Sequence, residues 1–184
     1  MRELSLHILD IIQNSITASA RDIELTIIED VKSDLFLIKV FDNGRGIRGD
    51  RLRQVTDPFV TSRTTRRVGL GLSLFQEAAR RCGGNLEIES TTGQGTRVTA
   101  YFKYTHIDRA PLGDIQGTLI SLMALNPEIH YRYHHIYNEN EFILDTEDIK
   151  KILGDIDINQ IEVLSWIREF LDEGLENLYG GDSK

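Results

Sequence analysis

The sequence predicts an α+β protein, with a two-layer α/β sandwich over residues 1–104 and a C-terminal α/β extension over residues 105–184. Two observations lead to this prediction. Along the first part, helical and strand periodicities follow in the order helix, strand, strand, helix, strand, strand, which is typical of a sheet covered by helices. The charge then changes, because residues 1–104 hold 15 Lys and Arg against 13 Asp and Glu, whereas residues 105–184 hold 6 against 16.

The first helix is predicted over residues 4–20, because apolar residues recur there at helical spacing. Its apolar face carries Leu4, Ile8, Ile11, Ile12 and Ser15. Asp10, Asn14 and Thr17 lie near one another on the opposite side. The helix therefore presents one face to a core and a short polar row elsewhere.

The rest of the sandwich is predicted as strands around one further long helix. Apolar runs indicate the strands, and a glycine pair indicates where the helix ends. The predicted elements are strands at residues 23–29 and 35–41, a loop with a short helix at 46–55, a loop at 57–69, a helix at 70–82 that stops at Gly83–Gly84, and strands at 85–90 and 96–104.

The extension is predicted to contain a helix, a β-hairpin and two more helices after a connector. These are a helix at 114–125, strands at 128–137 and 141–145, a helix at 146–153 with Thr146 as its N-cap, and a helix at 159–175. The tail from residue 180 is expected to fray. The extension either packs on the sandwich or forms a small acidic subdomain that docks a partner.

Two clusters in the extension have competing interpretations. His130, His134 and His135 suggest metal ligands, but on a strand the first two share a face and the third points away, so strand packing is preferred. The last predicted helix carries an apolar stripe that is either core or interface. This stripe consists of Val163, Trp166, Ile167, Phe170 and Leu171.

Composition excludes several classes of protein. No apolar run reaches the roughly 18–20 residues of a membrane helix, and Glu3 and Asp10 interrupt the pattern of a secretory leader. The single cysteine, Cys82, excludes an internal disulfide and fits a reducing cytoplasm. The extension has a net charge of −10, which would repel nucleic-acid phosphates. We therefore expect a cytoplasmic protein with neither a nucleic-acid nor a membrane partner.

The string DNGRGI suggests one end of a ligand site. Asp42 follows an apolar run that predicts a strand, so its carboxylate sits where a strand leaves the core. A buried carboxylate needs donors, and the exocyclic amine of adenine is one. Gly44 and Gly46 allow a backbone to pass close to a bulky group. Taken alone, the string is also a common turn sequence.

Two further segments suggest the other end of such a site. Glycine-flanked residues 69–71 open a helix, where free backbone N–H groups bind phosphate oxygens. The arginines just before it are Arg63, Arg66 and Arg67. Asn14 offers an amide oxygen to Mg²⁺, and Asp10, one turn earlier, could orient or deprotonate a water. Each signal is also compatible with an ordinary structural role, and their order along one chain favours a site.

The joint pattern resembles the ATP-binding domain of the GHKL superfamily, which contains sensor histidine kinases, anti-sigma-factor kinases, mismatch-repair ATPases, type II topoisomerases and a heat-shock chaperone. LDIIQNSITASA is similar to the N box and DNGRGI to the first glycine box. DPFVTSR, VGLGLSL and GGNLEIESTTGQGTRVTAYF are similar to the phenylalanine-bearing segment, the second glycine box and the closing hairpin of histidine kinases. The resemblance covers residues 1 to about 104. It implies a Bergerat-type sandwich holding ATP and Mg²⁺ under a mobile lid of roughly residues 56–70.

The resemblance also implies roles for individual residues. Asp10 would be the catalytic base, Asn14 the Mg²⁺ ligand and Asp42 the acceptor for the adenine amine. The other residues implied to contact ATP are Gly44, Gly46, Ile47, Phe59, Arg63, Gly69, Leu70, Gly71, Leu72 and Thr96. Asp10 departs from the family pattern, which commonly has Glu there in the ATPases and anti-sigma kinases and Asn in histidine kinases. Aspartate keeps the carboxylate but is one methylene shorter.

Three functions are compatible with these residues. No helical pair bearing a phosphoacceptor histidine precedes the N box, so a stand-alone protein is expected, and His7 is interpreted as a packing or surface residue. The chain would be a protein kinase resembling anti-sigma kinases, an ATPase switch, or a non-catalytic ATP/ADP sensor. In each case the extension is expected to serve as a surface for an unidentified protein partner or for a homodimer.

Overall fold

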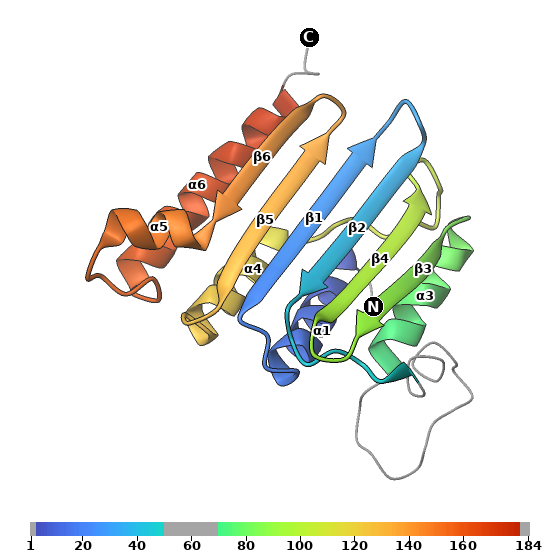
Figure 1. Cartoon of the computed structure of the whole chain (residues 1–184). Coiled ribbons are helices and arrows are strands. Elements are labelled where there is room, and N and C mark those ends of the chain that lie inside the picture. Colours follow the sequence, from blue (N-terminus) through green and yellow to red (C-terminus); the bar gives the residue numbers. More distant parts are fainter. Residues whose placement is uncertain (1–2, 50–69, 181–184) are drawn as a thin grey trace.

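A six-stranded mixed sheet with helices packed against one face forms the protein (Figure 1). The structure, a computed structural model, describes residues 3–49 and 70–180. The strand order is β3-β4-β2-β1-β5-β6. All neighbouring strands are antiparallel except β1 and β5, which are parallel. The predicted layering of a sheet against helices is therefore confirmed.

Among the described residues, the first part of the chain supplies four of these strands and the helices α1 and α3. They are α1 (Leu4–Thr17), β1 (Asp22–Asp30), β2 (Leu35–Asp42), α3 (Leu70–Arg81), β3 (Asn85–Thr91) and β4 (Gly95–Lys103). α1 ends three residues before the predicted limit, because Ser19 adopts a left-handed φ of 63° and turns the chain toward β1. The predicted loop at 57–69 and most of the segment predicted at 46–55 lie outside the described residues.

The extension continues the same sheet. It supplies α4 (Ile115–Leu125), β5 (His130–Tyr137), β6 (Asn140–Asp145), α5 (Thr146–Leu153) and α6 (Ile161–Tyr179). β5 pairs with β1 from Asp22 opposite His130 to Glu29 opposite Tyr137. Of the two arrangements that the sequence left open, the structure therefore shows the extension packed on the sandwich.

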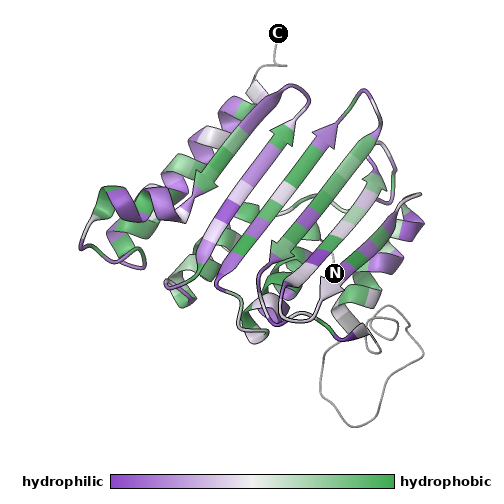
Figure 2. Ribbon diagram, viewed as in Figure 1, coloured by the Kyte–Doolittle hydropathy of each residue, from purple (hydrophilic) through white to green (hydrophobic). Residues whose placement is uncertain are grey.

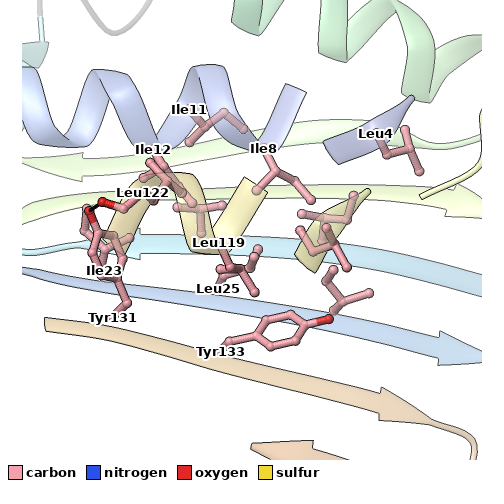
Figure 3. Close-up of a cluster of buried hydrophobic side chains, with 14 of the residues drawn as sticks. Leu4, Ile8, Ile11, Ile12, Ile23, Leu25, Leu119, Leu122, Tyr131 and Tyr133 are labelled. Atoms are coloured by element: carbon pink, nitrogen blue, oxygen red, sulfur yellow. Dashed lines mark hydrogen bonds between the residues drawn. The ribbon is translucent and has the colours of Figure 1, made fainter. Parts of the chain in front are cut away.

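The core lies between the sheet and the helices. Figure 3 shows side chains of α1 and α4 meeting those of β1 and β5. The labelled residues include Ile8, Ile12, Leu25, Leu119, Leu122 and Tyr133. β2 alternates between buried and half-buried residues along its length, which matches the period of a strand that covers a core with one face. Most residues of β2 are hydrophobic (Figure 2). Every residue of the apolar face predicted for α1 is buried, so that prediction is confirmed.

The predicted N-cap of α5 is wrong by one residue. Asp145, not Thr146, has the extended backbone of a cap, and its carboxylate accepts a hydrogen bond from the Glu147 N–H at 2.9 Å. Thr146 is fully buried, and its hydroxyl accepts a hydrogen bond from the Tyr131 N–H at 2.9 Å. Thr146 therefore holds the start of β5, a role that local sequence does not reveal.

α6 buries only part of its predicted stripe. Its buried residues are Val163, Ile167, Leu171, Leu175 and Leu178. Trp166 and Phe170 remain 45% and 39% exposed. The helix also continues to Tyr179, past the predicted end at residue 175, because its buried face continues. Neither α6 nor any other helix within the described ranges is long and apolar enough to cross a membrane.

The histidines of β5 point to opposite faces of the sheet, as predicted. His130 and His134 are half-buried on the face away from the helices, whereas His135 is fully buried on the other. Within residues 3–49 and 70–180 no group of His, Cys, Asp or Glu is arranged to hold a metal ion.

A buried polar network joins α6 to the centre of the sheet. His135 Nε2 lies 2.9 Å from Glu29 Oε1, and the Tyr133 hydroxyl lies 2.7 Å from His135 Nδ1. The Tyr179 hydroxyl at the end of α6 also donates to Glu29. Burial alone would raise the pKa of the Glu29 carboxyl, but hydrogen bonds from His135 and Tyr179 outweigh it and lower that pKa. A buried, ionised carboxylate thus ties the C-terminal helix to β1.

Replacing Tyr179 by phenylalanine tests this tie. Tyr179→Phe removes one donor from a buried charge, so the free energy of unfolding should fall by about 1–3 kcal/mol. Chemical denaturation monitored by circular dichroism measures the change. Tyr101→Phe on β4 is the matched control, since no described residue hydrogen bonds to its hydroxyl, and it should change stability much less. Equal effects of both substitutions would contradict the role of the network.

Candidate functional site

The end of β2 carries a buried carboxylate that is held by two donors. Asp42 is 5% exposed. The Ser15 hydroxyl on α1 donates to Asp42 Oδ2 at 2.7 Å, and the Gly44 N–H donates to Asp42 Oδ1 at 2.9 Å. A carboxylate has about four lone-pair positions, so these bonds leave acceptor capacity for a further donor.

The loop after β2 packs tightly on the turn between β3 and β4. Gly46 has a φ of +68°, and a Cβ there would lie 2.2 Å from the Thr91 carbonyl oxygen. A side chain is therefore excluded both by the left-handed backbone and by the contact. This close approach holds the loop beside the hairpin.

The hairpin places Thr96 beside Asp42. The two residues are direct partners in the β2–β4 register. Ser90 connects the hairpin to the loop: its hydroxyl lies 2.9 Å from Thr96 Oγ1 and accepts a hydrogen bond from the Ile47 N–H at 2.8 Å. Three predicted site residues, Asp42, Ile47 and Thr96, thus come together in one region.

The first turn of α3 lies directly against Asp10. A Cβ on Gly71 would lie 1.4 Å from Asp10 Oδ2, so the helix approaches the carboxylate this closely only because residue 71 is glycine. Asn14 follows Asp10 by one turn on α1, and both are half-buried. The structure thus places a carboxylate, an amide oxygen and the start of a helix in one region.

The other residues predicted to contact ATP either belong to α3 or lie outside the described residues. Leu70 is the first residue of α3, and Leu72 is buried in the core, 7% exposed. Phe59, Arg63 and Gly69 lie outside the described residues.

Sequence reasoning missed the part played by Ser15. It was assigned to the apolar face of α1, and it is indeed buried there, but its hydroxyl binds Asp42. A hydroxyl within an otherwise apolar face was the available signal, because a buried polar group needs a partner.

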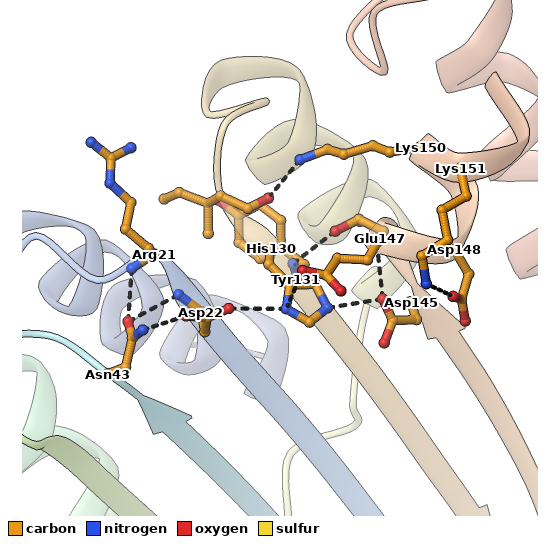
Figure 4. Close-up of polar contacts among 12 residues, drawn as sticks. Arg21, Asp22, Asn43, His130, Tyr131, Asp145, Glu147, Asp148, Lys150 and Lys151 are labelled. Atoms are coloured by element: carbon orange, nitrogen blue, oxygen red, sulfur yellow. Dashed lines mark hydrogen bonds and ion pairs between the residues drawn. The ribbon is translucent and has the colours of Figure 1, made fainter. Parts of the chain in front are cut away.

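Asn43 was also missed, and it links the loop to the extension (Figure 4). Its Oδ1 accepts from the N–H groups of Arg21 and Asp22 at 2.8 and 2.9 Å, and its amide donates to the Asp22 carboxylate. Asp22 Oδ1 lies 3.1 Å from His130 Nδ1, and His130 Nε2 lies 2.8 Å from Asp145 Oδ1. Hydrogen bonds therefore run from the residue after Asp42 to the N-cap of α5.

His7 packs in the core of the described structure. It is 4% exposed, and its ring stacks on Phe75 of α3 with centroids 4.7 Å apart. Burial lowers the pKa of its imidazole to about 4. His7 thus contributes to the contact between α1 and α3, which agrees with its interpretation as a packing residue.

Comparison with known families identifies the family to which the site-bearing part of the chain belongs. The family profile described as histidine kinase-, DNA gyrase B- and HSP90-like ATPase matches residues 2–106, more than half of the chain. The chain belongs to this ATPase family. The matched residues include α1, the loop after β2, the start of α3 and the β3–β4 hairpin.

Relatives within the family include long proteins of which this chain resembles one portion. Sporulation kinase D of Bacillus subtilis is 36% identical over 92 residues, covering 50% of this chain and 18% of that protein. The non-motile and phage-resistance protein of Caulobacter vibrioides is 32% identical over 111 residues, covering 55% of this chain and 13% of that protein. The chain thus spans less than a fifth of the length of these relatives.

A solved structure extends the similarity in fold to most of the chain. The N-terminal domain of a DNA repair protein superposes with a TM-score of 0.57 at 16% identity, covering 84% of this chain and 58% of that chain. At this identity the likeness concerns the fold alone. It exceeds the portion matched by the family profile, so the similarity in fold reaches into the extension.

The link through His130 predicts a pH dependence. Burial lowers the pKa of the His130 imidazole, but hydrogen bonds with Asp145 and Asp22 and the charge of Glu147 outweigh it and raise that pKa above 6.5. Protonated His130 therefore stabilises the fold below its ordinary pKa, and this contribution is lost as pH rises through the folded-state pKa.

The variant His130→Gln tests the direction of this pH dependence of stability. In urea denaturation, the stability difference between wild type and His130→Gln should be larger at about pH 6 than at about pH 9. Asp145→Asn keeps an N-capping residue but removes the charge, and in that background the pH dependence should shrink. A difference that grows toward high pH would contradict the assignment.

Proposed function

We propose that this chain binds Mg-ATP between α1, the loop after β2, the start of α3 and the β3–β4 hairpin, and acts in the cytoplasm as a protein kinase or ATPase switch on a partner protein. One observation carries the proposal. α1 contacts both ends of this region, since Ser15 holds Asp42 while Asp10 lies against Gly71. The order of these two contacts along α1 suits a nucleotide, with its adenine near Ser15 and its phosphates near Asp10.

Asp42 would recognise the adenine end. Its carboxylate is fixed by Ser15 and Gly44 and retains acceptor capacity, which suits the exocyclic amine of adenine. Thr96, beside Asp42 in the register, would line the same end. A preset acceptor favours adenine, because a base with a carbonyl at that position would oppose lone pair to lone pair.

The start of α3 and the polar row of α1 would hold the phosphates. Free N–H groups at a helix start bind anions, and glycine at residue 71 lets the backbone come close. Asn14 fits a magnesium ion, because an amide oxygen is a hard ligand and lies one turn from Asp10. When bound, the ion would neutralise charge on the phosphate oxygens.

Asp10 would act as the general base. Its carboxylate accepts the proton of an attacking hydroxyl, the oxygen of which bonds to the γ-phosphorus as the bond to the β-phosphate oxygen breaks and ADP departs. With water as the attacking group the reaction is hydrolysis, and with a partner's side chain it is protein phosphorylation. The similarity to a protein named sporulation kinase D supports the second version.

Asp42→Asn tests the adenine end. The amide places an N–H₂ where an acceptor is needed, so ATP affinity should fall by about 10- to 100-fold. Isothermal titration with ATP measures it, and circular dichroism checks folding. Glu87→Gln makes the same chemical change at an exposed position of β3 and should leave affinity intact. Unchanged ATP binding by Asp42→Asn would refute the site assignment.

Asp10→Asn tests the catalytic role. Loss of the base should reduce turnover by about 10²- to 10⁴-fold with ATP affinity nearly unchanged. Asp10→Glu keeps the carboxylate and should retain far more activity than the amide. The readouts are phosphate release and label transfer from γ-labelled ATP to a co-purified protein.

The two readouts also separate the hypotheses. Transfer of label to a protein favours the kinase, and phosphate release alone favours the switch. Turnover in Asp10→Asn equal to wild type would exclude both mechanisms in this form. Clear ATP binding with neither product would leave a non-catalytic ATP/ADP sensor.

A further inference from the structure

The outer edge of the sheet carries a groove far from the candidate nucleotide site. Among the described strands, β6 lies at the edge of the sheet and pairs with β5, and α6 runs beside it (Figure 1). A groove of about 580 Å³ lies between them. β6 contains neither Lys nor Pro, residues that commonly block an edge from pairing with another strand. In the described part of the chain no strand covers this edge.

Exposed aromatic side chains border the groove. Trp166 stacks on Phe170 with ring centroids 5.9 Å apart, and Phe170 meets Phe142 at 5.4 Å. Ile143 on β6 is 41% exposed. Opposite Phe142 stands Gly174, where a Cβ would lie 2.1 Å from the Phe142 ring. Glycine therefore lets Phe142 pack against the α6 backbone, and the rings of Trp166 and Phe170 remain at the surface.

The groove is acidic. Glu139, Glu141 and Glu173 line it, and its lining in the described residues contains neither Lys nor Arg. The extension as a whole holds 16 acidic against 6 basic residues. Two of these glutamates already have neighbours, since Glu139 pairs with Lys32 at 3.1 Å and Glu141 with His134 at 2.8 Å. Both glutamates of these pairs are exposed, so the pairs screen the acidic potential only in part.

Charge decides which occupant suits the groove. A second copy of this chain paired edge to edge would bring the same glutamates of both copies together, and like charges at such an interface are costly. A strand that carries Lys or Arg gains from the same glutamates. Large apolar side chains of that strand would cover Trp166, Phe170 and Ile143.

The geometry points to a docking surface, formed by β6 and α6, for an extended basic segment of a partner protein. The segment adds to β6 as a seventh strand through main-chain hydrogen bonds, places its cations beside the glutamates and packs apolar side chains on the aromatic border. Docking does not require nucleotide, because the groove lies at the opposite sheet edge from β3 and α3.

The probe is a fluorescein-labelled peptide of about eight residues that alternates Lys with Val, added to the full chain. Fluorescence polarisation should show binding that weakens with salt, and a Glu–Val peptide should not bind. Glu173→Lys should reduce affinity at least about 10-fold, because it reverses charge inside the groove. Glu176→Lys makes the same change one turn along α6, outside the groove lining, and should change affinity less than about 2-fold.

Further measurements distinguish strand addition from attraction between charges alone. Hydrogen exchange of the amides of residues 140–145 should slow when the peptide binds. An Ala–Lys peptide of equal charge but helical preference should bind much more weakly. Asp42→Asn should bind the Lys–Val peptide as wild type does, which separates this surface from the nucleotide site.

The proposal is overturned by any of several results. These are equal loss of binding in Glu173→Lys and Glu176→Lys, unchanged exchange over β6, equal binding of the helical peptide, and a concentration-dependent dimer in sedimentation with no peptide binding.

Discussion

A carboxylate buried at the end of β2 must be supplied with donors, and the candidate site is arranged around that requirement. Asp42 takes them from Ser15 on α1 and from the Gly44 N–H of its own loop. The first bond sets the position of α1 along the sheet. Because Asp10 belongs to the same helix, its position is set as well. The start of α3 is then held against Asp10 by a contact that only Gly71 permits.

A second buried carboxylate organises the other half of the molecule. Glu29 lies near the end of β1, one of the two central strands, and receives hydrogen bonds from His135 on β5 and Tyr179 at the end of α6. Removing water from a charge is costly, so these donors must stay in place, and they join the extension to the ATPase portion. The arrangement favours one rigid sheet over a loosely attached subdomain.

The two halves are also connected near the candidate site. Asn43 directly follows Asp42, caps the start of β1 and reaches His130 through Asp22. His130 in turn contacts Asp145, the N-cap of α5. Hydrogen bonds therefore connect the loop after β2 to the start of α5, and α6 is the next helix in the sequence.

Local pattern determined the strands, the helices and the family of this chain, because periodicity and short motifs are properties of neighbouring residues. DNGRGI, the polar row of Asp10 and Asn14, and the glycines at the start of α3 were visible without coordinates. The pairing of β5 with β1, the use of Thr146 as a strand anchor and the bond from Ser15 to Asp42 were decided only by the tertiary structure. Each of these contacts joins residues that are far apart in the sequence. The bond from Ser15 also gives a polar role to a residue within an apolar helix face. Burial and long-range pairing depend on which surfaces meet, and no local spacing encodes that.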